Sequence, residues 1–153
     1  MGVQTSIANA LLATLSGCVD CDCYERQFVT LGDPVIDCNT LAIGIQSFPV
    51  IAEVAGCQLA ELRMTIVAAQ CCVPLVGPKG EPPVEAELTK MAATMADEAE
   101  KLICCINSID IEVPGVVKQC SPKFYGVTYG RPLGGCVSAK LDVRIKGVPC
   151  CAT

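Results

Sequence analysis

Thirteen of the 153 residues are cysteines. Their redox state decides whether disulfides stabilise the fold or whether it depends on a hydrophobic core alone. An odd number of cysteines cannot pair completely within one chain. Three pairs are adjacent in sequence (residues 71–72, 104–105 and 150–151), and a bond between adjacent cysteines closes a small, strained ring. Reduced cysteine behaves as a small apolar residue and is often buried. We therefore expect mostly free thiols in a reducing cytoplasm, with disulfides and thiolate metal sites as the alternatives.

The best candidate for a metal site is the spacing Cys18-x2-Cys21-x-Cys23. Closely spaced thiolates suit zinc, and Cys38 or Cys57 would supply a fourth ligand. The sequence contains no second Cys-x2-Cys pair at the spacing of a zinc finger. We expect no metal and no cofactor. A zinc or redox module built on Cys18, Cys21, Cys23 and Cys38 is kept as the alternative.

Charge and the lack of histidine argue against several classes of function. The formal net charge is -5, from 11 basic and 16 acidic residues, which disfavours a protein whose main role is to bind nucleic acid. The absence of histidine removes Ser-His-Asp and Cys-His catalysis and histidine-ligated metals. The remaining carboxylates, lysines, tyrosines and cysteines show no spacing that singles out a catalytic set. We expect a protein that is not an enzyme and has no catalytic residue.

The first apolar segment, residues 7–15, has two interpretations. Leu15-Ser16-Gly17-Cys18 fits the cleavage box of a bacterial lipoprotein, with Cys18 as the lipidated residue. That interpretation needs a basic region before the apolar segment, whereas the first basic residue is Arg26. Apolar residues at three- and four-residue steps favour an amphipathic helix over residues 3–16, with Gly17 just after its end. No apolar stretch reaches the length of a transmembrane helix, so we expect no membrane partner.

The remaining pattern consists of strands and one long helix. A length of 153 residues suits a single domain, 1–153. A proline- and glycine-rich loop (74–83) precedes a helix at 84–106, whose Met91 and Met95 we expect to fill the core rather than line a ligand groove. This order of elements indicates an α+β fold, a mainly antiparallel β-sheet packed against two helices. The expected strands are residues 27–31, 40–48, 59–71, 123–130 and 136–148.

An ordered series of segments runs through nearly the whole chain. An Ala/Leu-rich helix and a cysteine cluster precede VIDCNTLA (35–42), which enters a strand that ends at Phe48-Pro49. The strand AELRMTIV (60–67) and the segment CCVP (71–74) follow, then the Pro/Gly loop and an Ala-rich helix with paired cysteines near its end. GRPLGGC (130–136) leads into the last strand. This series resembles the small, cysteine-rich tail terminator proteins of siphophages that infect actinobacteria.

The resemblance implies a structural virion protein that is assembled in the host cytoplasm and located at the head-proximal end of the tail. Tail terminators form a six-membered ring that docks on the last ring of the tail tube, stops tube polymerisation and receives the head-completion ring. The implied partners are further copies in a homohexamer, the tail tube protein and the head-completion or connector protein. Genomic DNA would pass through the lumen without sequence-specific binding. Another head–tail connector or a minor tail protein is the nearest alternative.

A ring of this kind needs a head-to-tail interface that closes. The strand at 137–148 alternates apolar and polar residues, so it is expected to be half-exposed. It would form the interface by strand pairing if it lies at a sheet edge, or by side-chain packing. The Pro/Gly loop would reach a neighbouring subunit or ring. The candidate interface residues are Lys140, Asp142, Arg144 and Lys146 on the strand, and Lys79 and Glu81 in the loop.

Overall fold

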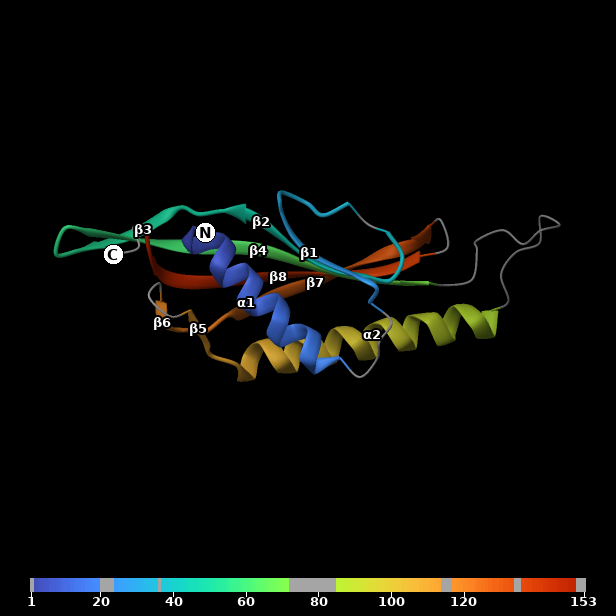
Figure 1. Cartoon of the computed structure of the whole chain (residues 1–153). Helices are drawn as coiled ribbons and strands as arrows, with labels where there is room; N and C mark the ends of the chain where they lie inside the picture. The colour runs from blue at the N-terminus through green and yellow to red at the C-terminus, as the bar shows by residue number, and fades with distance from the viewer. Residues whose placement is uncertain are drawn as a thin grey trace.

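The computed structural model describes residues 2–19, 24–35, 37–71, 85–113, 117–133 and 136–150. Two helices and eight strands follow one another along the described chain (Figure 1). Their bounds are α1 (Val3–Cys18), β1 (Arg26–Leu31), β2 (Thr40–Ser47), β3 (Val50–Val54), β4 (Cys57–Cys71), α2 (Glu85–Ser108), β5 (Ile111–Val113), β6 (Val117–Cys120), β7 (Lys123–Leu133) and β8 (Cys136–Pro149).

Six strands form one sheet in the order β1-β2-β4-β8-β7, and β3 pairs with the first part of β4. The β1–β2 pair is parallel, whereas the β2–β4, β3–β4, β4–β8 and β7–β8 pairs are antiparallel. Strands β5 and β6 form a separate two-stranded sheet. The expected α+β class with a mainly antiparallel sheet is confirmed at this level, and the sheet is mixed because of its one parallel pair.

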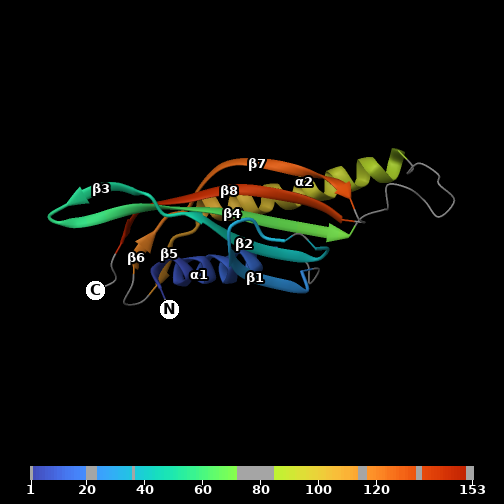
Figure 2. The same cartoon turned by 90° about the horizontal axis from the view of Figure 1, so that it is seen from above.

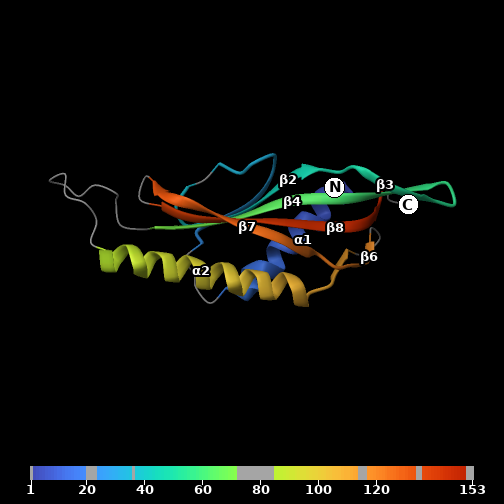
Figure 3. The same cartoon turned by 180° about the vertical axis from the view of Figure 1, so that it is seen from behind.

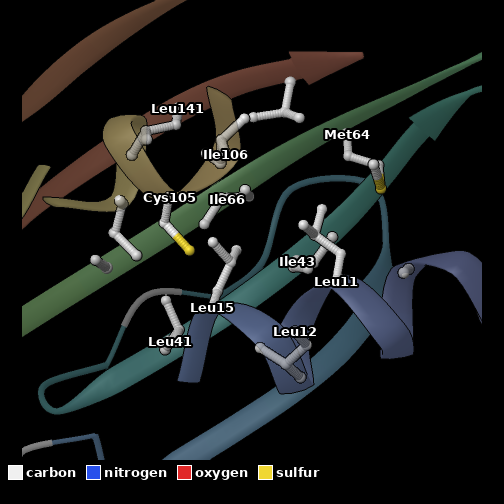
Figure 4. Packing of buried hydrophobic residues seen from close by; sticks show 14 of the residues in the cluster. Leu11, Leu12, Leu15, Leu41, Ile43, Met64, Ile66, Cys105, Ile106 and Leu141 are labelled. Atoms are coloured by element: carbon white, nitrogen blue, oxygen red, sulfur yellow. The ribbon is translucent and has the colours of Figure 1, made fainter. Parts of the chain in front are cut away.

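Both helices lie on the same face of the sheet, so the molecule has two layers (Figures 1 and 2). Helix α1 packs on β1 and β2, and α2 packs on β7 and β8. Alternate residues of the strands point into the space between the layers, because side chains of a strand alternate between its two faces. Figure 4 shows Leu11 and Leu15 of α1 meeting Ile43 of β2 and Ile66 of β4 in this core. All four are fully buried.

The parallel β1–β2 pair requires the chain to cross back over the sheet. The connection after β1 passes over the face that the helices leave open, above β2 (Figure 1). Gly44 of β2 makes this close approach possible, because an added Cβ would collide with the carbonyl oxygen of Gly32 and with Pro34. The open face of the sheet is therefore covered by this loop at β2 but not at β4 and β8.

The structure corrects several expected boundaries. Helix α1 continues to Cys18, so Gly17 lies inside the helix and is not its C-terminal cap; Val19 ends the helix in an extended conformation. The lipoprotein interpretation is not supported, because the apolar side chains of residues 7–15 pack into the core. Strand β3 was not expected at all. Strand β8 is not an edge strand, because it is paired with β4 on one side and β7 on the other.

Strands β4 and β8 are unusually long, with 15 and 14 residues. At about 3.3 Å per residue, β4 spans roughly 50 Å. Its first residues run past the helical layer together with β3, and form a hairpin that projects from one end of the sheet (Figures 1 and 3). We call residues 50–59 the arm. Helix α2 begins at the opposite end of the molecule (Figures 1 and 2).

Candidate functional site

The expected interface residues of β8 lie on the sheet face opposite the helices, as their alternation predicts. Ala139, Leu141, Val143 and Ile145 are buried, and the polar residues between them are partly or fully exposed. A groove of about 710 Å³ runs along this open face. Its lining includes Lys140, Asp142 and Arg144 from β8, Arg63 and Thr65 from β4, Gly126 to Thr128 from β7, and Asp33, Gln46 and Ser47.

A buried carboxylate organises the charges next to this groove. The side chain of Glu61 on β4 is only 5% exposed, and its Oε1 accepts a hydrogen bond of 2.6 Å from Nε of Arg63. Nη1 of Arg144 lies 3.9 Å from the same oxygen, and Nζ of Lys146 lies 4.0 Å from Oε2. One carboxylate thus faces three cations, which allows Arg63 and Arg144 to lie directly opposite each other in the β4–β8 register.

Arg144 is held in place by two further groups. Its Nη2 donates to Oδ2 of Asp142 at 3.1 Å, and its guanidinium lies 4.3 Å from the ring centre of Tyr125. The hydrogen bond to Asp142 raises the pKa of Arg144, so the guanidinium stays charged. The sequence analysis named Asp142, Arg144 and Lys146 as candidates, and the structure places them beside Glu61 and Arg63, which the sequence analysis did not name. The signal was present in the polar positions of β4, but the strand pairing was needed to bring them beside β8.

The arm is the second candidate surface, and sequence reasoning missed it. All five residues of β3 are exposed. Val50, Ile51 and Val54 remain 52%, 47% and 59% exposed, although all three are large and apolar. The turn at Ala55 and Gly56 has positive φ angles of 51° and 79°, as a tight two-residue hairpin turn requires. An apolar run ahead of Ala-Gly was the available signal, but it lacks the alternation that marks a half-buried strand.

A second groove, of about 430 Å³ and apolar, lies at the other end of the molecule. It is formed between the first half of α2 and the neighbouring ends of β7 and β8. Met95 is buried as expected, whereas Met91 is only partly buried and lines the groove, so the expectation that both fill the core was wrong for Met91. The lining consists of Leu88, Met91, Ala92, Met95, Ala96, Tyr129, Gly130 and Val137.

The expectation of mostly free thiols needs correction. Cys18 is bonded to Cys105, which ties α1 to α2, and Cys38 is bonded to Cys136, which ties the segment before β2 to the start of β8. These pairings depend on tertiary proximity across 87 and 98 residues, which spacing in the sequence does not reveal. Among the cysteines whose side chains the structure describes, those with free thiols are Cys57, Cys104, Cys120 and Cys150.

The alternative zinc site is not assembled in the described residues. Cys18 and Cys38 belong to different disulfides, and Cys21 and Cys23 lie outside the described residues. Asp37 is grouped with Cys38 and Cys136, with their ligand atoms within 4.8 Å of one another. Both sulfurs of this group are bonded to each other, and Oδ2 of Asp37 forms an ion pair with Arg26 at 2.8 Å. A cysteine whose sulfur is in a disulfide cannot serve as a thiolate ligand.

The other two expected interface residues, Lys79 and Glu81, lie outside the described residues. Within the described part of the chain, neither helix is long and apolar enough to cross a membrane. The structure thus offers three surfaces for interaction: the polar groove of the open sheet face, the arm and the apolar groove beside α2. No protein-family model matches the chain, and a search of curated proteins finds no match.

Proposed function

We propose that this chain is a structural phage protein, a tail terminator whose copies form a hexameric ring at the head-proximal end of the tail tube. The ring stops tube polymerisation and joins the tail to the head-completion complex. The ordered segments of the sequence that resemble this family suggest the identity. The observation that carries self-association is the arm, which exposes three large apolar side chains on a hairpin that the helices do not cover.

An exposed apolar hairpin is costly for a protein that works as a monomer. A lone two-stranded hairpin is marginally stable in water, and an exposed apolar surface promotes association. At the base of the arm, the Glu61 amide donates to the Pro49 carbonyl at 2.9 Å. The end of β8 supports the β4 side of the arm, where Leu59 pairs with Pro149 and the Cys150 amide donates to the Gln58 carbonyl at 3.0 Å. Within the described residues, β3 pairs with β4 alone. A ring of identical subunits would cover the arm without requiring a different partner.

Two measurements test the proposal. Native mass spectrometry of the purified chain is expected to give a species of six 16.0 kDa subunits. The second assay adds the chain to a polymerising tail tube protein and follows tube length by electron microscopy. A terminator shortens the tubes in proportion to its concentration and appears as a ring on one end. Tubes that grow to the same length with and without the chain would refute the terminator function, even if the chain forms rings.

A further inference from the structure

We propose that the arm of one copy docks into the apolar groove beside α2 of the next copy. This inference rests on the proposed ring and specifies its subunit contact. The arm supplies a protruding apolar element, Val50, Ile51 and Val54, and the groove supplies a concave apolar one, lined by Leu88, Met91, Met95, Tyr129 and Val137 among others. Both are surfaces on which removal of apolar area from water favours association.

The position of the two surfaces excludes contact within one chain. The arm projects from one end of the long β4–β8 pair, and α2 begins at the other end (Figures 1 to 3). The residues that line the groove come from the first half of α2 and from the neighbouring ends of β7 and β8. An arm can therefore reach only the groove of another copy. Different patches on the two partners make the contact head-to-tail, and repetition of such a contact generates a ring when the rotation closes.

The charge of the surfaces distinguishes this contact from an alternative contact through the polar face of the sheet. The described lining of the groove contains no charged side chain, and Glu53 is the only charged residue of the arm. Association through these surfaces should change little with salt. Association through Arg63, Lys140, Arg144 and Lys146 would weaken as salt screens the charges.

The groove can be closed by a substitution that leaves the fold intact. Ala92 lines the groove but is exposed, so Ala92→Glu adds bulk and charge there at a position where glutamate suits a helix. Ala93 is also exposed but does not line the groove, and Ala93→Glu is the matched control. The arm variant is Ile51→Asp with Val54→Asp, and its control, Glu53→Lys, reverses the arm's charge but keeps its apolar side chains.

Sedimentation and native mass spectrometry then report the assembly state. Ala92→Glu and the double arm variant are each expected to raise the dissociation constant about tenfold or more, while both controls assemble like the wild type. An equimolar mixture of the two defective variants should give a 1:1 complex and nothing larger, because only one intact arm and one intact groove remain per pair.

Three results would overturn the docking. The first is that Ala92→Glu assembles with wild-type affinity. The second is that the mixture of the two variants gives no complex although the wild type forms rings. The third is that the wild type stays monomeric at its highest soluble concentration. The tube-length assay distinguishes a failure of this contact from a failure of the function. Tube termination by Ala92→Glu rings overturns the docking and leaves the terminator intact. Arm-dependent wild-type rings that do not stop tubes support the docking and refute the terminator.

Discussion

At the scale of single residues, two buried polar side chains and one partly buried side chain join parts of the chain that are far apart in sequence. The hydroxyl of Tyr24 donates to Oε1 of Glu98 on α2 at 3.1 Å and accepts from Nε2 of Gln70 on β4 at 3.1 Å. Tyr24 and Glu98 are 6% exposed. A buried carboxylate is tolerated only where donors satisfy it, so Tyr24 stabilises the approach of α2 to the sheet.

The alkaline stability of the protein should depend on Tyr24. Burial raises the pKa of its hydroxyl above the ordinary 10.0; the bond from Gln70 lowers the pKa, and Glu98 raises it further. The folded state therefore keeps a proton that the unfolded state releases, so the stability is fully present below pH 10 and falls as the pH rises further. Tyrosinate absorbance should show one of three tyrosines titrating late, and Tyr24→Phe should remove that step. An unchanged late step in Tyr24→Phe would contradict the assignment.

Glu61 should be worth more to stability than an ordinary surface carboxylate. Glu61→Gln keeps the shape but leaves Arg63, Arg144 and Lys146 without their shared anion. Arg63 and Lys146 are half-exposed and can be resolvated, so we expect a loss of about 1–2 kcal/mol in the free energy of unfolding. Urea unfolding measures it. Glu53→Gln on the exposed arm is the control, with a change within about 0.5 kcal/mol; equal effects of the two substitutions would rule out the special role.

At the scale of elements, the arm and the centre of the sheet should differ in local stability. Strand β3 of the arm pairs on one side only, with β4, whereas Ile66 in the middle of β4 is fully buried and has paired strands on both sides. Amides of residues 50–58 should exchange with solvent much faster than those around Ile66 in the monomer. The arm amides should become protected on assembly. Arm exchange that is already slow in the monomer would show that the hairpin does not need a partner.

The two disulfides should contribute separately to stability. Each closes a long loop, and removal of such a bridge costs about 2–4 kcal/mol. Cys18→Ser should loosen the contact between α1 and α2, and Cys38→Ser the contact between the start of β2 and β8. Cys57→Ser removes an exposed free thiol and is the control. Urea unfolding of the variants with and without reductant measures the effect, and a wild type insensitive to reductant would show that the cysteines are reduced.

The elements that the sequence predicts well are those with a regular apolar period and a single buried face. Helix α1, the second half of α2 and strand β8 belong to this group. Alternation in β8 predicts which side chains face solvent. It does not reveal whether both edges of the strand are paired, so the sequence is equally consistent with an edge strand and a central one. Strand β3 has no buried face and therefore no period. Glu61 and the disulfides depend on register and tertiary contact, which one sequence without structure does not supply.

At the scale of the whole molecule, the two layers differ in charge. Helix α2 carries five acidic and two basic residues, whereas the polar face of β4 and β8 gathers four cations around Glu61 and Asp142. Asp33 also lines that face, so its described cations and carboxylates nearly balance, and the described helix α2 carries more of the net negative charge of -5. Charge interactions of that face with a partner would be short-ranged at physiological salt, where the screening length is about 8 Å.

The length of the β4–β8 pair sets the distance between the two ends of the subunit. The arm includes the beginning of β4, and Val137 of the apolar groove lies opposite Gln70 near the end of β4. If these ends carry the subunit contacts, the number of residues in the strand sets the perimeter of the ring. Removing two residues from each strand would shorten each subunit by about 7 Å without reversing its inward and outward faces, whereas removing one would turn the core outward. The diameter of the ring's central channel would thus change only when both strands are lengthened or shortened by an even number of residues.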